Sequence, residues 1–98
     1  MTAMTTYDVV TSLADDGLVT FPTAVAGWGQ VMVANGAEWA TFLFDTSGTV
    51  LLRESSTNVV NTDTDTKFCI YDAGAGIAIK NRLGSTKKVA IEIHYFTP

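Results

Sequence analysis

Hydrophobic and polar residues alternate along much of the chain, and this period of two predicts β-strands rather than helices. In the last segment, one set of alternate positions is strongly apolar: Val89, Ile91, Ile93 and Tyr95. Residues 76–82 alternate in the same way, and a turn at 83–86 with a glycine at position 84 separates the two segments. We therefore expect these two strands to form a hairpin with Gly84 at a positive φ.

The same pattern predicts strands at 7–13, 18–21, 28–34, 39–45, 49–54 and 68–72, with a shorter one near 58–60. The adjacent valines 9 and 10 make the first of these ambiguous with a short helix. Turn residues separate the strands, and Asn35-Gly36 is a strong hairpin signal. About seven to nine short strands with turns every 8–12 residues or so are typical of an all-β sandwich or barrel. We expect a two-sheet antiparallel sandwich with jelly-roll-like topology, and an open sandwich of another topology as the alternative.

The chain has 98 residues, which is the size of one domain. We place that domain at residues 6–98 and a loose tail at residues 1–5. Hydrophobic residues make up 47% of the chain and charged residues only 16%, against about 25% in a typical protein. This composition favours a folded core over disorder. It also leaves a weakly charged surface, which suits either packing between subunits or an ordinary neutral exterior.

Charge argues against nucleic acid or an anionic membrane as the main partner, because the net charge is −4. Residues 1–49 contain no Lys or Arg, whereas four basic residues lie close together near the C-terminal end: Lys80, Arg82, Lys87 and Lys88. This polarity could set the register of a head-to-tail contact between copies, or it could belong to a solvated hairpin.

A single cysteine, Cys69, excludes an intrachain disulfide, and its apolar surroundings predict a buried, inert thiol. The first residues lack the basic and apolar regions of a signal peptide, and no apolar stretch approaches the roughly 20 residues that span a bilayer. We therefore expect the protein to be made and folded in a reducing cytoplasm.

Two motifs resemble ligand sites but depart from them at important positions. Asn61, Asp63, Asp65 and Asp72 partly match a calcium loop, yet Thr66 stands where that loop needs glycine and no helices are expected to flank it. Gly74-Ala75-Gly76 resembles the start of a dinucleotide fingerprint without its third glycine. We expect a polar loop and a hairpin turn at these places, and neither a metal nor a cofactor.

Few residues of the chain are candidates for catalysis. His94 is the only histidine, and Glu92 shares its strand face, but no nucleophile motif accompanies them. An enzyme would need a concave pocket that groups His94 with carboxylates, so we expect a non-enzymatic protein. Trp28 and Trp39 are instead candidate platforms for a glycan, with packing in the core or in a subunit interface as the alternative.

The stretch from residue 58 to residue 96 resembles β-domains of bacteriophage virion proteins of the head-decoration and tail-fibre types. The resemblance rests on three strings, N-T-D-T-D from Asn61, C-I-Y-D-x-G from Cys69 and I-K-N-R-L-G from Ile79, followed by the alternating last strand. It covers 39 of the 98 residues and carries no catalytic motif. Within the third string, Asn81 and Arg82 are candidate structural or interface residues.

The resemblance implies a non-enzymatic structural protein of the virion, either a capsid decoration or a tail or fibre component. Such proteins are commonly symmetric homo-oligomers, often trimers, and contact other virion proteins. The candidate interface then comprises Lys80, Asn81, Arg82, Lys87 and Lys88. A carbohydrate-binding β-sandwich module that uses exposed Trp28 and Trp39 is the alternative.

Overall fold

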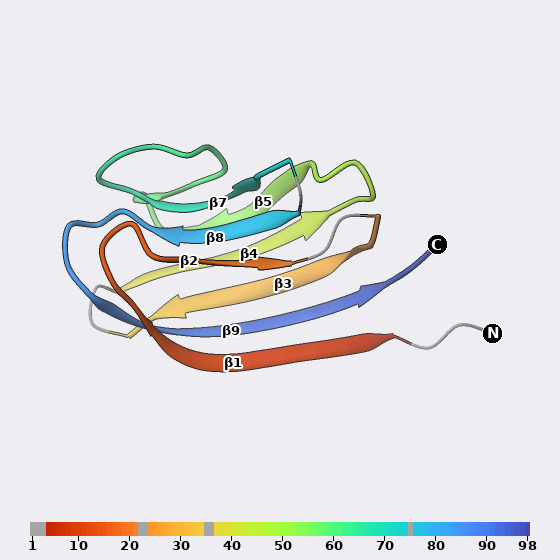
Figure 1. Ribbon diagram of the computed structural model, residues 1–98, viewed down its shortest axis with the longest axis horizontal. Coiled ribbons are helices and arrows are strands. Elements are labelled where there is room, and N and C mark those ends of the chain that lie inside the picture. Colours follow the sequence, from red (N-terminus) through yellow and green to blue (C-terminus); the bar gives the residue numbers. More distant parts are fainter. Residues whose placement is uncertain (1–3, 22–23, 35–36, 75) are drawn as a thin grey trace.

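The computed structural model describes residues 4–21, 24–34, 37–74 and 76–98, and the regular elements in this part of the chain are all β-strands. They are β1 (Thr5–Leu13), β2 (Leu18–Phe21), β3 (Ala26–Val33), β4 (Glu38–Phe44), β5 (Val50–Ser55), β6 (Val59–Val60), β7 (Phe68–Asp72), β8 (Ile77–Asn81) and β9 (Lys87–Phe96). Figure 1 shows the strands in two layers, with both termini at one end. The all-β sandwich predicted from the alternation is confirmed.

Sheet A contains five strands in the order β1-β9-β3-β4-β5, and all its neighbours are antiparallel. Sheet B contains four strands in the order β2-β8-β7-β6. The short strand β6 pairs with β7 in parallel, so sheet B is mixed rather than wholly antiparallel.

The two ends of the chain wind around the sandwich together. Strands β1 and β2 follow each other in sequence but lie in different sheets, as do β8 and β9. Strand β1 pairs with β9 and β2 pairs with β8, which gives the topology its jelly-roll-like character. The middle of the chain is simpler. Strands β3, β4 and β5 are consecutive antiparallel neighbours in sheet A, and β7 and β8 form an antiparallel hairpin in sheet B.

The predicted hairpin between residues 76–82 and the last strand is wrong. Both strands exist and Gly84 has a φ of 100°, as expected, but β8 pairs with β2 and β7 whereas β9 pairs with β1 and β3. The segment after β8 crosses between the layers instead of turning back beside its own strand. Of the other predicted turns, Asn35-Gly36 lies outside the described residues.

Asn81 explains why the chain crosses at this point. Its side-chain nitrogen donates to the carbonyl oxygens of Leu13 and Ser85 at 2.9 and 2.8 Å, and its side-chain oxygen accepts from the N–H of Leu83 at 3.0 Å. Its own main chain also bonds to Asp16 and Gly17. A single buried side chain therefore joins both crossovers, the one from β1 to β2 and the one from β8 to β9.

The core fills the space between the sheets with the predicted apolar positions of the last strand and the inner residues of β3, β4, β7 and β8. The fully buried members with the largest side chains are Phe42, Phe68, Ile70, Ile79, Ile93, Val33 and Val89. Gly27 and Gly29 make this packing possible on β3. A Cβ at Gly29 would lie 2.7 Å from the Phe42 ring, and one at Gly27 would overlap the carbonyl of His94.

The predicted tail is shorter where the structure describes it. Residues 1–3 lie outside the described residues, but Thr5 already pairs with Tyr95 in β1. The strand thus begins one residue before the predicted domain boundary.

Candidate functional site

The outer face of sheet A, which points away from sheet B, carries side chains in rows that run across its strands. The strand register aligns the first apolar row, formed by Val10, Ala90, Met32 and Trp39. It aligns the second apolar row behind it, formed by His94, Trp28, Leu43 and Leu51, with Thr6 at the β1 end. Between them lies the polar row, formed by Asp8, Glu92, Gln30, Thr41 and Glu54.

Apolar exposure is concentrated on this face. Of the nine large hydrophobic side chains that are exposed among the described residues, six belong to the two apolar rows: Val10, Trp28, Met32, Trp39, Leu43 and Leu51. The most exposed are Val10 at 65%, Met32 at 60% and Leu51 at 59%. Met4 is also exposed, immediately before β1. Large apolar side chains gathered on one exposed face indicate a site of contact with another molecule.

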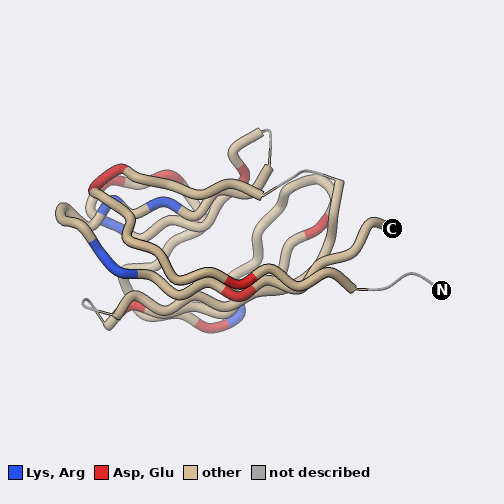
Figure 2. The backbone as a smooth tube through the Cα atoms, turned by 60° about the horizontal axis from the view of Figure 1, so that its bottom comes forward, with Lys and Arg blue, Asp and Glu red and all other residues tan. Residues whose placement is uncertain are grey.

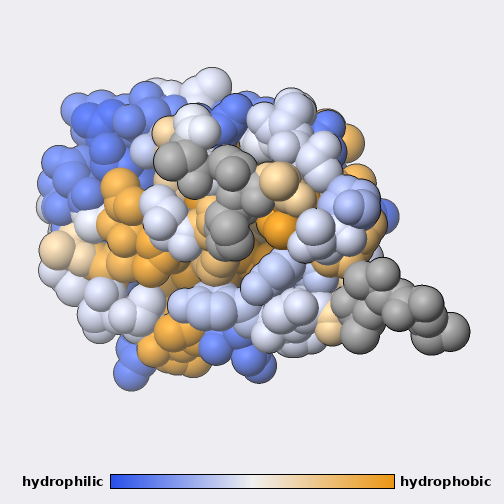
Figure 3. Space-filling model, turned by 45° about the vertical axis from the view of Figure 1, so that its right-hand side comes forward, coloured by the Kyte–Doolittle hydropathy of each residue, from blue (hydrophilic) through white to orange (hydrophobic). Residues whose placement is uncertain are grey.

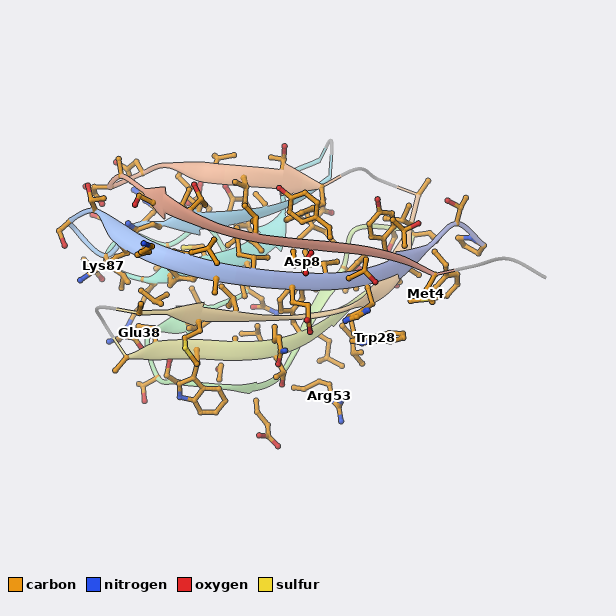
Figure 4. The ribbon with its side chains drawn as sticks, turned by 90° about the horizontal axis from the view of Figure 1, so that it is seen from below. Met4, Asp8, Trp28, Glu38, Arg53 and Lys87 are labelled. Atoms are coloured by element: carbon orange, nitrogen blue, oxygen red, sulfur yellow. The ribbon has the colours of Figure 1, made fainter. Side chains whose placement is uncertain are left out.

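The polar row is already organised. The side-chain amide of Gln30 donates to a Glu92 oxygen at 2.9 Å, which joins the polar residues of β3 and β9. A shallow hollow of about 760 Å³ extends from this row over the first apolar row and is bordered by Asp8, Met32 and Trp39. Asp8 projects from the centre of β1 in Figure 4. The hollow therefore combines an apolar side with a polar side that carries the carboxylates of Asp8 and Glu92.

A second, smaller hollow of about 180 Å³ lies beside Trp28 and is lined also by Gln30, Arg53, Glu92 and His94. The His94 ring stacks on Trp28, with ring centres 5.6 Å apart and planes inclined by 20°. Trp28 and Arg53 are labelled near each other in Figure 4. The inner positions on either side of Trp28 are glycines, so the indole is the only side chain that this part of β3 presents.

His94 does meet the carboxylate that shares its strand face. Its Nε2 lies 3.3 Å from a Glu92 oxygen, and its Nδ1 lies 3.3 Å from the Thr6 hydroxyl. A hydroxyl, an imidazole and a carboxylate thus form a chain on the outer face. All three side chains lie on an open sheet surface, and Trp28 occupies one side of the imidazole. The arrangement positions the imidazole against the indole, at the border of the smaller hollow.

The candidate interface residues at the end of β8 bond within their own chain. Arg82 contacts Asp16 at 3.0 Å, Asp63 at 3.2 Å and Asp65 at 3.7 Å, and Lys80 contacts Asp63 at 3.4 Å. These ion pairs hold the turn after β1 and the loop before β7 against β8. The hydrogen bond to Asp16 contributes most to raising the pKa of Arg82.

The five candidate interface residues therefore divide into two groups. Asn81 is fully buried, so its interface role is replaced by the structural one described above. Lys80 and Arg82 remain partly exposed, and Lys87 and Lys88 lie at the start of β9. Most basic residues gather at the end of the molecule opposite the termini (Figure 2). A contact through these four remains a prediction.

The loop with calcium-like spacing is held by protein cations and by its own polar groups. Asp63 and Asp65 face Arg82, the Thr62 and Thr64 hydroxyls are 2.7 Å apart, and Asn61 donates to the Val50 carbonyl. Thr66, at the position where a calcium loop has glycine, has a φ of 70° and so adopts the left-handed conformation. Within the described residues, no group of three or more His, Cys, Asp or Glu side chains is placed to hold a metal.

Cys69 is fully buried, as predicted, but outside the core between the sheets. Its sulfur lies 3.4 Å from the N–H of Thr64 and 3.3 Å from the carbonyl oxygen of that residue, so the loop before β7 covers it. Burial raises the pKa of its thiol, which disfavours the reactive thiolate form. The Gly74 turn connects β7 and β8, in agreement with the predicted hairpin; Ala75 lies outside the described residues.

Comparison of the chain with protein-family models, with curated proteins and with solved structures found no match. The described residues contain no helix long and apolar enough to cross a membrane. Among the described residues, the outer face of sheet A carries six of the nine exposed large hydrophobic side chains.

Proposed function

We propose that this chain is a non-enzymatic structural protein of a bacteriophage virion, and that it assembles through the outer face of sheet A. The observation that carries the assembly is the pair of apolar rows, in which six large side chains are exposed on one sheet face. The virion setting is supported by the resemblance of residues 58–96 to virion β-domains. The weakly charged composition, with 16% charged residues, suits a subunit that is largely covered by neighbours.

The chemistry of the rows favours a protein partner. Val10, Met32, Leu43 and Leu51 are aliphatic, and they offer a partner hydrophobic burial without directional contacts. Full burial of such a side chain is worth about 1.5–3 kcal/mol. The polar row between them would give the contact its orientation, because the carboxylate of Asp8 at the edge of the hollow would favour a donor or a cation of the partner. A homo-oligomer is the proposed assembly, with a trimer expected from the resemblance.

Met32→Glu is expected to weaken this assembly while leaving the fold intact. Met32 is 60% exposed in the first apolar row, so a carboxylate there costs little in the free subunit but is buried in the contact. We expect the wild-type protein to show the mass of a homo-oligomer by light scattering. The concentration at which half of the oligomer dissociates should be about tenfold to a hundredfold higher for the variant than for the wild-type protein. This corresponds to a loss of roughly 1–3 kcal/mol in the free energy of association.

Leu18→Glu is the matched control, because Leu18 is an exposed leucine on β2 in the other sheet. It should keep the wild-type mass. A wild-type protein that stays monomeric at every concentration and never attaches to a virion would overturn the proposal.

A glycan-binding module is the second candidate, and the small hollow beside Trp28 is what favours it. Gln30, Arg53 and Glu92 provide hydrogen-bonding groups next to an indole that is 47% exposed. Under this candidate, a glycan array should identify a ligand that changes tryptophan fluorescence. Trp28→Ala should abolish that response, whereas Thr57→Ala, at an exposed turn, should retain it. Absence of a response to every glycan on a broad array would exclude this candidate.

A further inference from the structure

Strand β1 forms an open edge of sheet A that lacks the usual protection against pairing. Natural edge strands are made short, are bent by bulges, or carry lysine or proline. Strand β1 is nine residues long, its sequence TTYDVVTSL has no lysine or proline, and its register with β9 is regular. Asp8 is its only charged residue.

The other edges of the two sheets are protected. The pairing of β5 with β4 contains a register shift between Thr41 and Phe42, and β5 carries Arg53 and Glu54. Strand β2 has four residues and β6 has two. The open edge at β1 is thus a specific feature of one strand. Figure 1 shows β1 at the lower boundary of the sheet, next to β9.

The hydrogen-bond pattern identifies which groups of β1 are available. The N–H of Ala34 donates to the carbonyl of Lys88, so the even-numbered residues of β9 bond to β3 and the odd-numbered ones bond to β1. Odd-numbered β9 residues pair with odd-numbered β1 residues, such as Ile91 with Val9. The main-chain N–H and C=O groups that point to the open edge are therefore those of Thr6, Asp8, Val10 and Ser12.

We propose that β1 pairs antiparallel with β1 of a second copy, about a two-fold axis that passes between the two Val9 residues. This register overlaps the whole of Thr5–Leu13 with itself and places Val9 opposite Val9 of the second copy. The pairs that exchange hydrogen bonds are then Asp8 with Val10 and Thr6 with Ser12, each occurring twice. Four pairs that each exchange two bonds would satisfy every open main-chain group of β1.

The side chains of β1 favour this register over the one centred on Asp8. An axis through Asp8 would place two carboxylates directly opposite each other, which is destabilising. An axis through Val9 places Asp8 opposite a valine instead. It also brings the second copy's Thr11 next to Tyr7, which is 39% exposed although it lies on the inward side of β1.

Exposed apolar side chains are not confined to the two rows, because Met4, Tyr7 and Leu18 are also exposed. Figure 3 shows apolar surface between polar residues on the side that it turns forward. Edge pairing would cover part of the inward side of β1 and would continue sheet A into a ten-stranded sheet across the axis. The outer faces of the two copies would then lie side by side. Combined with a three-fold contact through those faces, the pairing would give a closed assembly of dihedral symmetry.

Val10→Pro tests the pairing without disturbing the contact with β9. The N–H of Val10 points to the open edge, so proline removes a donor that only a second copy would use, and edge strands tolerate proline at such positions. The test is made in Met32→Glu protein, in which the contact through the outer face is weakened. We expect this protein to have the light-scattering mass of two copies, and addition of Val10→Pro to reduce it to one.

Val10→Thr in the same protein is the control, because it keeps the N–H, and it should retain the mass of two copies. A mass of one copy for the Met32→Glu protein at every concentration would overturn edge pairing. It would leave the proposed function standing if the wild-type protein forms an oligomer.

Cross-linking tests the register itself. Opposite residues of a pair without mutual hydrogen bonds have Cα atoms about 4.5 Å apart, within the range of a disulfide. Val9→Cys should therefore give a disulfide-linked dimer with oxidised glutathione, in which two thiols are oxidised and the glutathione disulfide is reduced. Tyr7→Cys should not, because its partner position is Thr11. Wild-type protein is the control for buried Cys69. Cross-linking of Tyr7→Cys but not Val9→Cys would overturn the register.

Discussion

Ile91→Asp is expected to leave the protein largely unfolded at room temperature. Ile91 is 2% exposed at the centre of β9, where it pairs with Val9 on one side and Val31 on the other. A carboxylate in this position would lie in the core without a partner. We expect the free energy of unfolding to fall by more than about 4 kcal/mol, measured by urea denaturation followed by circular dichroism.

Ala90→Asp is the matched control, because the adjacent residue of β9 is exposed on the outer face of sheet A. In the free subunit, the same carboxylate there should change the free energy of unfolding by less than about 1 kcal/mol. Equal losses for the two variants would contradict the assignment of inner and outer faces on which the candidate site depends.

Asn81→Leu is expected to destabilise the protein by about 3 kcal/mol. The two side chains have similar volumes, so the loss comes from hydrogen bonds rather than from a cavity. The carbonyls of Leu13 and Ser85 and the N–H of Leu83 would each lose the partner that Asn81 provides. A buried polar group without a partner costs about 1–3 kcal/mol. Thermal unfolding and urea denaturation would measure the change.

Asn61→Leu provides the comparison, because Asn61 is exposed and makes one side-chain hydrogen bond, to Val50. Its loss should stay near 1 kcal/mol or below. If Asn81→Leu costs no more than Asn61→Leu, Asn81 does not hold the two crossovers together.

Strand positions could be predicted from the sequence because each depends on local alternation. The positions of β1, β4, β7 and β9 agree with their predicted ranges to within a few residues. Strand pairing was predicted less well. The turn at 83–86 looks the same whether the chain folds back in its own sheet or crosses to the other, since Gly84 has a positive φ in either case. In the crossing that forms, Asn81 bonds to Leu13, which is remote from it in sequence.

The candidate site was only partly visible in the sequence. Trp28 and Trp39 were candidate glycan platforms, with packing in the core or in a subunit interface as the alternative, and both are exposed on one sheet face. The aliphatic residues around them were missed, although the sequence carries a signal for them. Val9-Val10, Phe42-Leu43-Phe44 and Val50-Leu51-Leu52 are apolar at consecutive positions, so strands there have two apolar faces. Only the register between distant strands shows that the second set forms continuous rows.

The role of the basic residues could not be predicted from the sequence for a different reason. Their clustering near the C-terminal end suggested a contact with another copy, but Asp16, Asp63 and Asp65 lie across from Arg82 in the fold. Alternation places side chains on faces, and it does not show which loops from elsewhere in the chain will meet them. Local charge density therefore could not distinguish a contact between copies from ion pairs within one chain.

Tryptophan fluorescence tests the central claim most directly, because both tryptophans of the chain, Trp28 and Trp39, lie on the outer face of sheet A. Covering this face would move both indoles out of water, whereas pairing through the β1 edge alone would leave them exposed. If the face is the assembly surface, raising the protein concentration through the association range should shift the emission to shorter wavelength and reduce quenching by acrylamide. Met32→Glu should move both changes to higher concentration. Tryptophans that stay equally open to acrylamide in the monomer and in the assembled protein would contradict the claim.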